Sequence, residues 1–257
     1  MRLDKYLSQS GERSRTEAGR LIRSGAVQVN GQVVRKPDTQ ISPDAQVVLA
    51  GVEIGDSSQQ YYLLHKPAGV LTAARDNRAR TVMDLVPENL RKRKVLPVGR
   101  LDKDTTGLLL LTNDGELAHF LLSPNRHVWK EYRATVTGQL TQADTEAFAN
   151  GLQLSDFVAK PAKLTIVEST PESSVALVEV REGKFHQVKR MFAATGHEVT
   201  ALHRHRFGPL TLPEDLPVGQ CRPLTEEEVQ ALRASVRTRR KDSEEIEPPQ
   251  GKGNENG

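Results

Sequence analysis

Residues 98–112 read VGRLDKDTTGLLLLT, a charged loop followed directly by an apolar run. The four leucines at 108–111 leave no polar face, which predicts a strand that is buried on both sides. The loop carries Asp102 and Asp104, and Asp114 follows the strand in an Asn-Asp-Gly turn. Because loops held on a rigid sheet often carry functional groups, this stretch predicts part of the core and also the place of the chemistry.

Further strands are predicted on both sides of the leucine run. Apolar patterns indicate strands at 61–67, 130–138, 163–168, 174–180 and 198–207. Helices are indicated at 116–122, 141–151 and 186–196, and a capping box at Thr225 and Glu228 begins a last one. Since the strands come in runs without regular βαβ alternation, the pattern predicts an α+β fold in which helices flank a largely antiparallel sheet.

Residues 1–50 predict a small separate αβ module. Ser14 and Glu17 form a capping box that begins a helix, and Gly25 is placed to end it. The sequence VQVNGQVV at 27–34 then alternates around Asn30-Gly31. Both residues of that pair favour positive φ, so they indicate a tight β-hairpin.

The rest of the chain divides into a linker, a larger domain and a tail. Residues 51–60 are polar without periodicity and indicate a linker. The larger domain takes up 61–236, and 237–257 are so poor in apolar residues that we expect a disordered charged tail. The longest apolar runs fall far short of the roughly 20 residues of a membrane span. The start of the chain lacks the apolar core of a secretory signal, and the single Cys221 suits a reducing cytoplasm.

Basic residues gather in two parts of a chain whose net charge is only +3. Residues 1–36 hold eight Lys or Arg against three acidic residues, and residues 184–206 hold five against one, with four histidines. Arg15, Arg20 and Arg23 lie off the apolar stripe of the N-terminal helix, so they face solvent or a ligand. Two separated basic regions indicate a polyanion held at two points, with solvated surface charge as the alternative.

Three kinds of chemistry are conceivable for aspartates spaced like Asp102 and Asp104. A calcium loop is excluded, because its twelfth position would be Asn113 and leucines stand where polar ligands are needed. The pattern D-x-D-x-T at 102–106 is similar to the signature of haloacid-dehalogenase-type phosphatases, but the chain has no Asp-Asp pair to hold their Mg²⁺. The third kind is metal-free work by Asp102 as nucleophile or base, although a carboxylate near Arg100 also fits a plain ion pair.

Two resemblances choose between these possibilities. The stretch RLDKYLSQSGERSRTEAGRLIRSGAVQVNG at 2–31 resembles the S4 RNA-binding domain, against the alternative of an accessory protein-binding module. The stretch GRLDKDTTGLLLLTNDGELAHFLLSP at 99–124 resembles the central motif of the bacterial ribosomal RNA pseudouridine synthases. K-x-Y at 130–132 and EGKFHQVKRMFAATG at 182–196 resemble the partner motifs of that family. YYLLHKPAG at 61–69 and RPLTEEE at 222–228 are most similar to the branch that acts on small-subunit 16S rRNA.

The resemblance implies an isomerase that breaks the glycosidic bond of a uridine, turns the detached uracil and rejoins it through carbon 5. The substrate implied is 16S rRNA or a 30S assembly intermediate, with uridine 516 as the modified position, and the protein implied is a cytoplasmic monomer. Because the product is an isomer, no metal, redox cofactor or ATP is implied. The rival reading is a non-catalytic S4-type RNA-binding factor in ribosome assembly.

The same resemblance assigns roles to individual residues. Asp102 falls on the family's catalytic aspartate, as nucleophile or base, and Tyr132 on the tyrosine whose ring stacks on the flipped uracil. Arg100 would fill the space that the flipped base leaves. Lys189 falls on the cation that pairs with the aspartate, a neighbour that favours the charged form of a carboxylate.

Three further roles follow from position and from the resemblance to the S4 domain. Arg190 is the second choice for the cation that pairs with Asp102. His186 and Gln187, at the start of the same helix, would contact phosphate or support the site. In the S4-like module, the residues expected to grip the RNA backbone are Arg15, Arg20 and Arg23. No metal ligands are expected, because His203 and His205 lack acidic or thiolate partners at suitable spacing.

Overall fold

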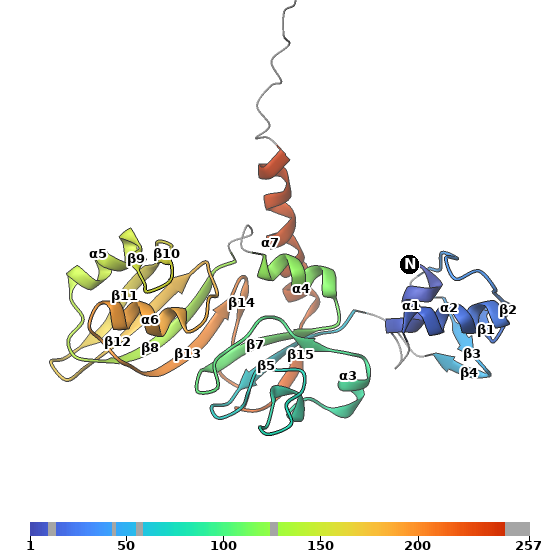
Figure 1. Ribbon diagram of the computed structural model, residues 1–257, viewed down its shortest axis with the longest axis horizontal. Coiled ribbons are helices and arrows are strands. Elements are labelled where there is room, and N and C mark those ends of the chain that lie inside the picture. Colours follow the sequence, from blue (N-terminus) through green and yellow to red (C-terminus); the bar gives the residue numbers. More distant parts are fainter. Residues whose placement is uncertain (10–13, 43–44, 55–58, 124–127, 245–257) are drawn as a thin grey trace, which may run out of the picture.

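The computed structural model describes residues 1–9, 14–42, 45–54, 59–123 and 128–244. Within these ranges the chain forms an N-terminal module and a larger α+β domain, as the sequence predicts (Figure 1). No helix in the described part of the chain is both long and apolar enough to cross a membrane.

The N-terminal module packs two helices against a four-stranded sheet. The capping box of Ser14 and Glu17 is formed, and Gly25 ends the second helix with a φ of 83°. Asn30 and Gly31 both have positive φ in the hairpin turn, which confirms the hairpin. The elements are α1 (Leu3–Gln9), α2 (Arg15–Ser24), β1 (Val27–Val29), β2 (Gln32–Val33), β3 (Val47–Leu49) and β4 (Val52–Ile54), with sheet order β2-β1-β3-β4.

The predicted boundaries of the module and the tail need correction. Strand β4 pairs with β3, so residues 52–54 belong to the sheet of the module and not to the predicted linker. Residues 55–58 of that linker lie outside the described residues. At the other end, α7 (Glu226–Glu244) continues past the predicted boundary at 236, because the helix begun by the Thr225–Glu228 capping box meets no helix breaker there. The remainder of the predicted tail, 245–257, lies outside the described residues.

The larger domain is built on a nine-stranded sheet. Its main path has the order β11-β12-β8-β13-β7-β5-β15, with β14 beside β13 and β6 beside β7. β13 and β7 are parallel, and the other strand pairs in the described part of this sheet are antiparallel. The strands are β5 (Tyr61–Lys66), β6 (Leu96–Pro97), β7 (Thr106–Thr112), β8 (Lys130–Thr137), β11 (Lys163–Ser169), β12 (Ser173–Val180), β13 (Val199–Phe207), β14 (Leu210–Thr211) and β15 (Cys221–Pro223).

Strand β7 separates two hydrophobic cores. Leu109 and Leu111 belong to one core, while Leu108 and Leu110 belong to the other. Because all four leucines are fully buried, the prediction of a strand covered on both faces is confirmed. The loop before β7 is therefore attached to a strand that is held from both sides.

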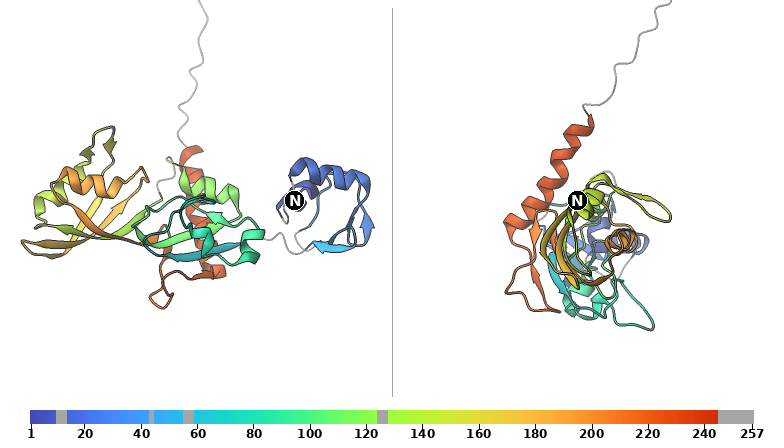
Figure 2. Two further views of the ribbon diagram at one scale, coloured as in Figure 1. Left: turned by 60° about the horizontal axis from the view of Figure 1, so that its bottom comes forward. Right: turned by 90° about the vertical axis from the view of Figure 1, so that its left-hand side faces the viewer.

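Different helices cover the two cores. α5 (Gln142–Asn150) and α6 (Gln187–Ala194) pack together through Phe148 and Phe192, whose ring centroids lie 5.0 Å apart. α4 (Gly115–Leu122) and α7 share the other core, and Figure 2 shows them on one side of the sheet. Short elements that the sequence pattern does not predict complete the domain: η1 (Val82–Asp84), α3 (Glu88–Lys92), β6, β9 (Leu152–Gln153), β10 (Val158–Ala159), β14 and β15.

The parallel contact between β7 and β13 depends on a glycine. Gly107 has a φ of 107°, and a Cβ atom there would collide with the backbone carbonyl of Arg204. Only glycine permits such a close approach of two strands. This contact brings β13 next to the loop that carries Asp102.

Candidate active site

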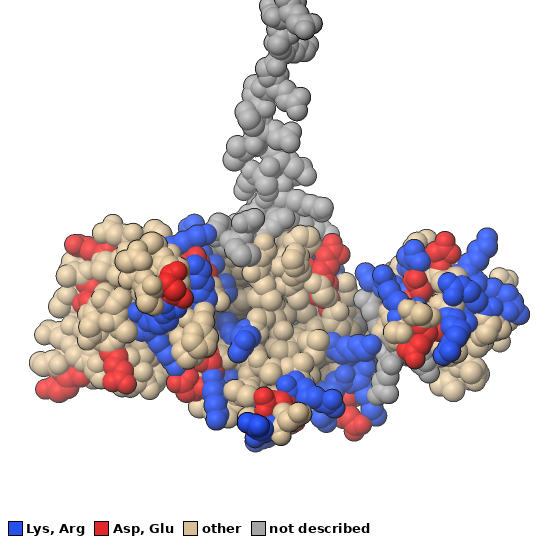
Figure 3. All heavy atoms as spheres, viewed as in Figure 1, with Lys and Arg blue, Asp and Glu red and all other residues tan. Residues whose placement is uncertain are grey.

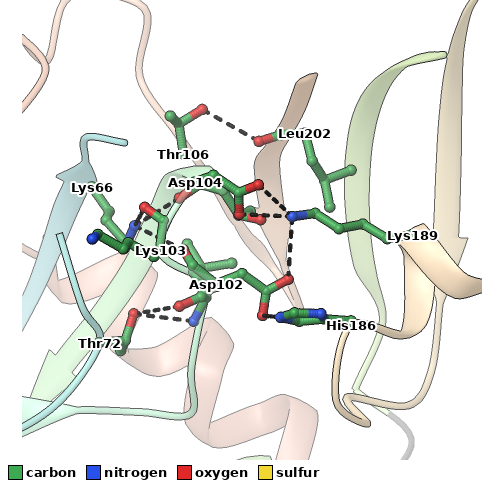
Figure 4. Close-up of polar contacts among 11 residues, drawn as sticks. Lys66, Thr72, Asp102, Lys103, Asp104, Thr106, His186, Lys189 and Leu202 are labelled. Atoms are coloured by element: carbon green, nitrogen blue, oxygen red, sulfur yellow. Dashed lines mark hydrogen bonds and ion pairs between the residues drawn. The ribbon is translucent and has the colours of Figure 1, made fainter. Parts of the chain in front are cut away.

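The loop that carries Asp102 is clamped by a buried lysine from the neighbouring strand. Lys66, the last residue of β5, is fully buried, and its Nζ lies 2.8–3.2 Å from four backbone carbonyl oxygens. Three of these carbonyls belong to Asp102, Lys103 and Thr105, so one ammonium group holds most of the loop (Figure 4). The sequence reasoning missed Lys66, although a lysine that ends an otherwise buried strand and precedes a proline was a visible signal.

Burial has an electrostatic consequence for Lys66. It lowers the pKa of the ammonium group to about 8, an effect that the nearby charges of Asp104 and Asp102 partly oppose. Lys66 is therefore still mainly protonated at neutral pH. A charged donor surrounded by carbonyl oxygens makes stronger hydrogen bonds than a neutral one, which suits a group that fixes a loop.

Further hydrogen bonds fix the backbone on either side of Asp102. The hydroxyl of Thr72 donates to the carbonyl of Leu101 at 2.8 Å and accepts from its amide at 3.2 Å. The amide of Thr105 donates to the carbonyl of Asp102 itself. With the backbone held in this way, the Asp102 carboxylate remains partly exposed, at 26% of its side-chain surface.

The second wall of the site is the turn that leads into α6. Residue His186 precedes this helix and adopts a left-handed conformation, with φ 49° and ψ 29°. For a residue with a side chain this conformation costs about 1–2 kcal/mol. The imidazole makes no capping bond with the helix, and its Nε2 lies 3.6 Å from Oδ1 of Asp102. Backbone strain of this kind is concentrated at functional sites.

Lys189 lies between the two aspartates of the loop. Its Nζ is 2.6 and 2.7 Å from the carboxylate oxygens of Asp104 but 3.9 Å from the nearest oxygen of Asp102 (Figure 4). The carboxylate of Asp104 is therefore paired with a side chain 85 residues further along the chain. The hydrogen bond from Lys189 lowers the pKa of Asp104 below its ordinary value. In this arrangement the Lys189 ammonium forms ion pairs with both carboxylates, and its shorter contacts are with Asp104.

A small cavity of about 50 Å³ brings together five of the seven site residues that we expect in the larger domain. Its lining includes Arg100 and Asp102 from the loop, Tyr132 from β8, and His186 and Gln187 from the start of α6. Tyr132 is mostly buried on the core side of β8, whereas Arg100 is exposed at the rim. A carboxylate that borders an aromatic side chain in one cavity is arranged to act on a planar group placed between them.

Two expected RNA contacts have other partners in the structure. Gln187 is only 5% exposed, and its amide bonds to Glu182 and to the backbone of Lys184, so it supports the turn and does not face solvent. The guanidinium of Arg190 bonds to Ser155 and Asp156 in the connection between β9 and β10.

Three basic residues of β13 have partners within the protein. Arg204, counted in the second basic region, is 2% exposed, because a period of two places it on the same face of β13 as Leu202. Its guanidinium lies 6.0 Å from the ring of Tyr132 and donates to the carbonyl of Leu108. His203 is bonded to Thr106 and His205 is paired with Glu131. No cluster of three or more potential metal ligands occurs among the described residues.

The arginines expected to bind RNA in the N-terminal module, Arg15, Arg20 and Arg23, are all exposed on α2. Figure 3 shows Lys and Arg gathered on this module and also along the boundary between two parts of the larger domain. Asp114, the third aspartate of the opening stretch, has a structural role. Its carboxylate caps α4 and accepts a hydrogen bond from Tyr61, which leaves Asp102 as the aspartate of the cavity.

Comparison with known proteins agrees with this geometry. The model of the family described as RNA pseudouridylate synthase matches residues 60–194, and the S4 domain model matches residues 1–47. The chain belongs to the RNA pseudouridylate synthase family. The match covers the loop with Asp102, the strand with Tyr132 and all of α6.

Three curated relatives and one solved structure place the chain within this family. It is 39% identical over 235 residues to ribosomal small subunit pseudouridine synthase A of Escherichia coli K12, which covers 90% of this chain and 100% of the relative. Two Bacillus subtilis proteins are equally similar. The uncharacterised RNA pseudouridine synthase YtzG is 42% identical, covering 90% of this chain and 98% of the relative. Ribosomal large subunit pseudouridine synthase B is 38% identical, covering 91% and 96%. A crystal structure of a pseudouridylate synthase has a TM-score of 0.64 and 35% identity, and covers 90% of this chain and 99% of that one.

Proposed function

We propose that this pseudouridine synthase converts one uridine of 16S rRNA into pseudouridine, with Asp102 as the catalytic residue. The observation that carries the proposal is the partly exposed carboxylate of Asp102 in the lining of a cavity that also includes Tyr132. The backbone carbonyl of Asp102 is held by the Lys66 ammonium. The target base has to leave the RNA stack to reach Asp102. Because the cavity is small, entry of the base also requires side chains at the rim to move, and Arg100 is an exposed residue of this rim.

The reaction requires no external electrons or atoms. The bond between N1 of uracil and C1′ of the ribose breaks, and a bond between C5 and C1′ forms. The proton on C5 leaves, and N1 ends with a proton. Asp102 acts as a nucleophile toward the substrate or as the base that removes a proton. Tyr132 stacks on the uracil, and Lys189 neutralises part of the negative charge beside Asp102.

The choice of 16S rRNA is supported by the small-subunit relative. The large-subunit enzyme of Bacillus subtilis is nearly as similar, so the two RNAs must be compared directly. Incubation of the protein with 16S and 23S transcripts, without any cofactor, is expected to give one carbodiimide-dependent primer-extension stop, in 16S rRNA. Position 516 is the first to inspect. A stop that occurs only in 23S rRNA contradicts the proposal that 16S rRNA is the substrate. If neither transcript nor ribosomal particles show a stop, the proposed enzymatic activity is wrong.

The same experiment tests the rival function of a non-catalytic RNA-binding factor in ribosome assembly. Such a factor binds 16S rRNA but leaves its uridines unchanged. The clamped Asp102 loop favours the enzyme, because a binding protein gains nothing from a partly exposed carboxylate facing a polyanion.

We expect the N-terminal module to hold RNA through phosphate contacts from Arg15, Arg20 and Arg23. Changing all three to Ala should weaken RNA binding and flatten the dependence of log K on log salt concentration by about 2 units, because each lost contact removes ~0.7–0.9 from the slope. Filter binding across a salt series measures this slope. Arg91→Ala, which removes an exposed arginine from α3, is the control. An unchanged slope in the triple variant contradicts the role of the module.

A further inference from the structure

Phe185 is an aromatic side chain that the reaction described above does not use. It is 71% exposed, and it is the only aromatic residue among the strongly exposed large apolar residues in the described part of the chain. A single exposed apolar residue needs no special explanation on a protein surface. The position of Phe185 and its surroundings therefore have to carry the argument.

Phe185 lies one side chain away from the catalytic carboxylate. Its ring stacks on the imidazole of His186, with ring centroids 3.8 Å apart and planes inclined by 17°. The same imidazole lies 3.6 Å from Asp102. A flat, exposed aromatic surface therefore stands beside the cavity that receives the target base.

The turn that carries Phe185 is fixed on both sides. The amide of Lys184 is bonded to Gln187, and the Lys184 ammonium lies 3.7 Å from the ring centroid of Phe157. His186, on the other side, adopts the strained left-handed conformation. Since the neighbours are anchored, the exposed ring of Phe185 is presented by a rigid backbone and costs little entropy to order on binding.

Flipping a base exposes the faces of its neighbours in the RNA. An aromatic side chain that covers such a face contributes about 1–3 kcal/mol per base. Arg100 belongs to the loop side of the cavity, and the turn with Phe185 forms its helix side. The two residues are thus placed to support different parts of the opened RNA strand.

We propose that Phe185 is an RNA-stacking residue that covers the base next to the flipped uridine. This inference rests on the proposed function. It commits to RNA as the partner, because Lys184 and the partly exposed Lys189 provide cations for phosphates on the same segment. Stacking of this kind lowers the free energy of the flipped state and of the transition state that follows.

The test uses the full-length protein and a 16S transcript. Phe185→Leu keeps apolar volume but removes the ring, and kcat/KM under single-turnover conditions is expected to fall about 5- to 150-fold, the equivalent of one lost stacking contact. Phe185→Trp should restore most of the loss. Val218→Ala, at another exposed apolar residue, should have no effect. The thermal midpoint of Phe185→Leu should match that of the wild type, because the ring is mostly exposed.

A spectroscopic measurement separates stacking from a merely structural role. A 2-aminopurine base is placed on either side of the target uridine in a short RNA, and its fluorescence is measured with each protein. The wild type and Phe185→Trp should quench it at one of the two positions, and Phe185→Leu should not. Equal quenching and equal rates for all variants overturn the inference. Such a result on protein-free RNA is also the one expected if Phe185 contacts a ribosomal protein instead of a base. A wild type that forms no pseudouridine overturns the proposed function and this inference together, whereas an active wild type matched by Phe185→Leu overturns the inference alone.

Discussion

Asp102→Asn is expected to reduce pseudouridine formation by about 10⁴-fold or more, because it removes the only aspartate in the lining of the cavity that Tyr132 shares. The other carboxylate in this lining, that of Glu182, is bonded to Gln187. Asparagine has nearly the same shape, and Lys66 bonds to the backbone of residue 102, so the loop should keep its conformation. Affinity for RNA should stay within about threefold of the wild type, as for a surface change of ~0.5 kcal/mol. Single-turnover product formation and filter binding measure the two effects.

Asp104→Asn is the matched control for this result. Asp104 lies two residues away, is 71% exposed at its side chain and forms the closer pair with Lys189. Its loss should leave Lys189 free to approach Asp102, so activity should remain within a few-fold of the wild type. Exposed ion pairs contribute only about 0–1 kcal/mol, and the fold should be equally stable. If Asp104→Asn were as inactive as Asp102→Asn, the assignment of catalysis to Asp102 alone would be wrong.

Lys66→Met is expected to damage both stability and activity. Methionine fills a similar volume but leaves four carbonyl oxygens without their shared donor, and breaking a buried charged network typically costs about 3–5 kcal/mol. In a protein of this size such a loss corresponds to a Tm lower by roughly 10 °C. A displacement of the Asp102 loop by about 1 Å should lower kcat about 10²-fold.

Lys103→Met is the control for this variant, because Lys103 is an exposed lysine in the same loop. It should keep the wild-type Tm. Urea unfolding, monitored by the fluorescence of the single tryptophan, Trp129, gives the free energy of unfolding of each protein. Equal unfolding free energies and rates for Lys66→Met and the wild type would show that the clamp is not needed.

The difference in unfolding free energy between the wild type and Lys66→Met should depend on pH, and the pKa of Lys66 fixes the sign of this dependence. This pKa is about 8 in the folded protein, below the 10.5 of an ordinary lysine. Between these values the unfolded chain binds a proton that the folded chain lacks, so folding stability rises with pH. The free energy of unfolding of the wild type should therefore increase relative to that of Lys66→Met as the pH is raised from 8 to 10. Lys130, whose pKa burial also lowers to about 8, is present in both proteins and cancels from the difference.

The sequence was most informative where a pattern depends on neighbours along the chain. The leucine run, the capping box of Ser14 and Glu17 and the Asn30-Gly31 turn predict β7, α2 and a hairpin that the structure contains. Hydrophobic periodicity and local backbone bonding determine these features. Short elements such as β9 and β14 depend mainly on contacts with distant strands, so the pattern did not predict them.

The candidate site was predicted less completely, because its geometry depends on long-range contacts. The resemblance pointed to Asp102, Tyr132 and Lys189, and the structure brings them to one place. The closer contact of Lys189 with Asp104 depends on differences of about an ångström in side-chain position, which spacing along the chain does not contain. Lys66 was missed because its partners lie 36–39 residues further along the chain, in a loop whose conformation was not yet known.

The leucine strand β7 connects the loop of Asp102 to both hydrophobic cores of the domain. One of its faces rests on the core beneath α6, and the other rests on the core of α4 and α7. A cavity made at Leu232 in α7, which is fully buried, therefore removes support from the same strand that anchors the Asp102 loop. We therefore expect apolar substitutions in α7, a helix without a residue in the lining of the candidate cavity, to lower activity together with stability.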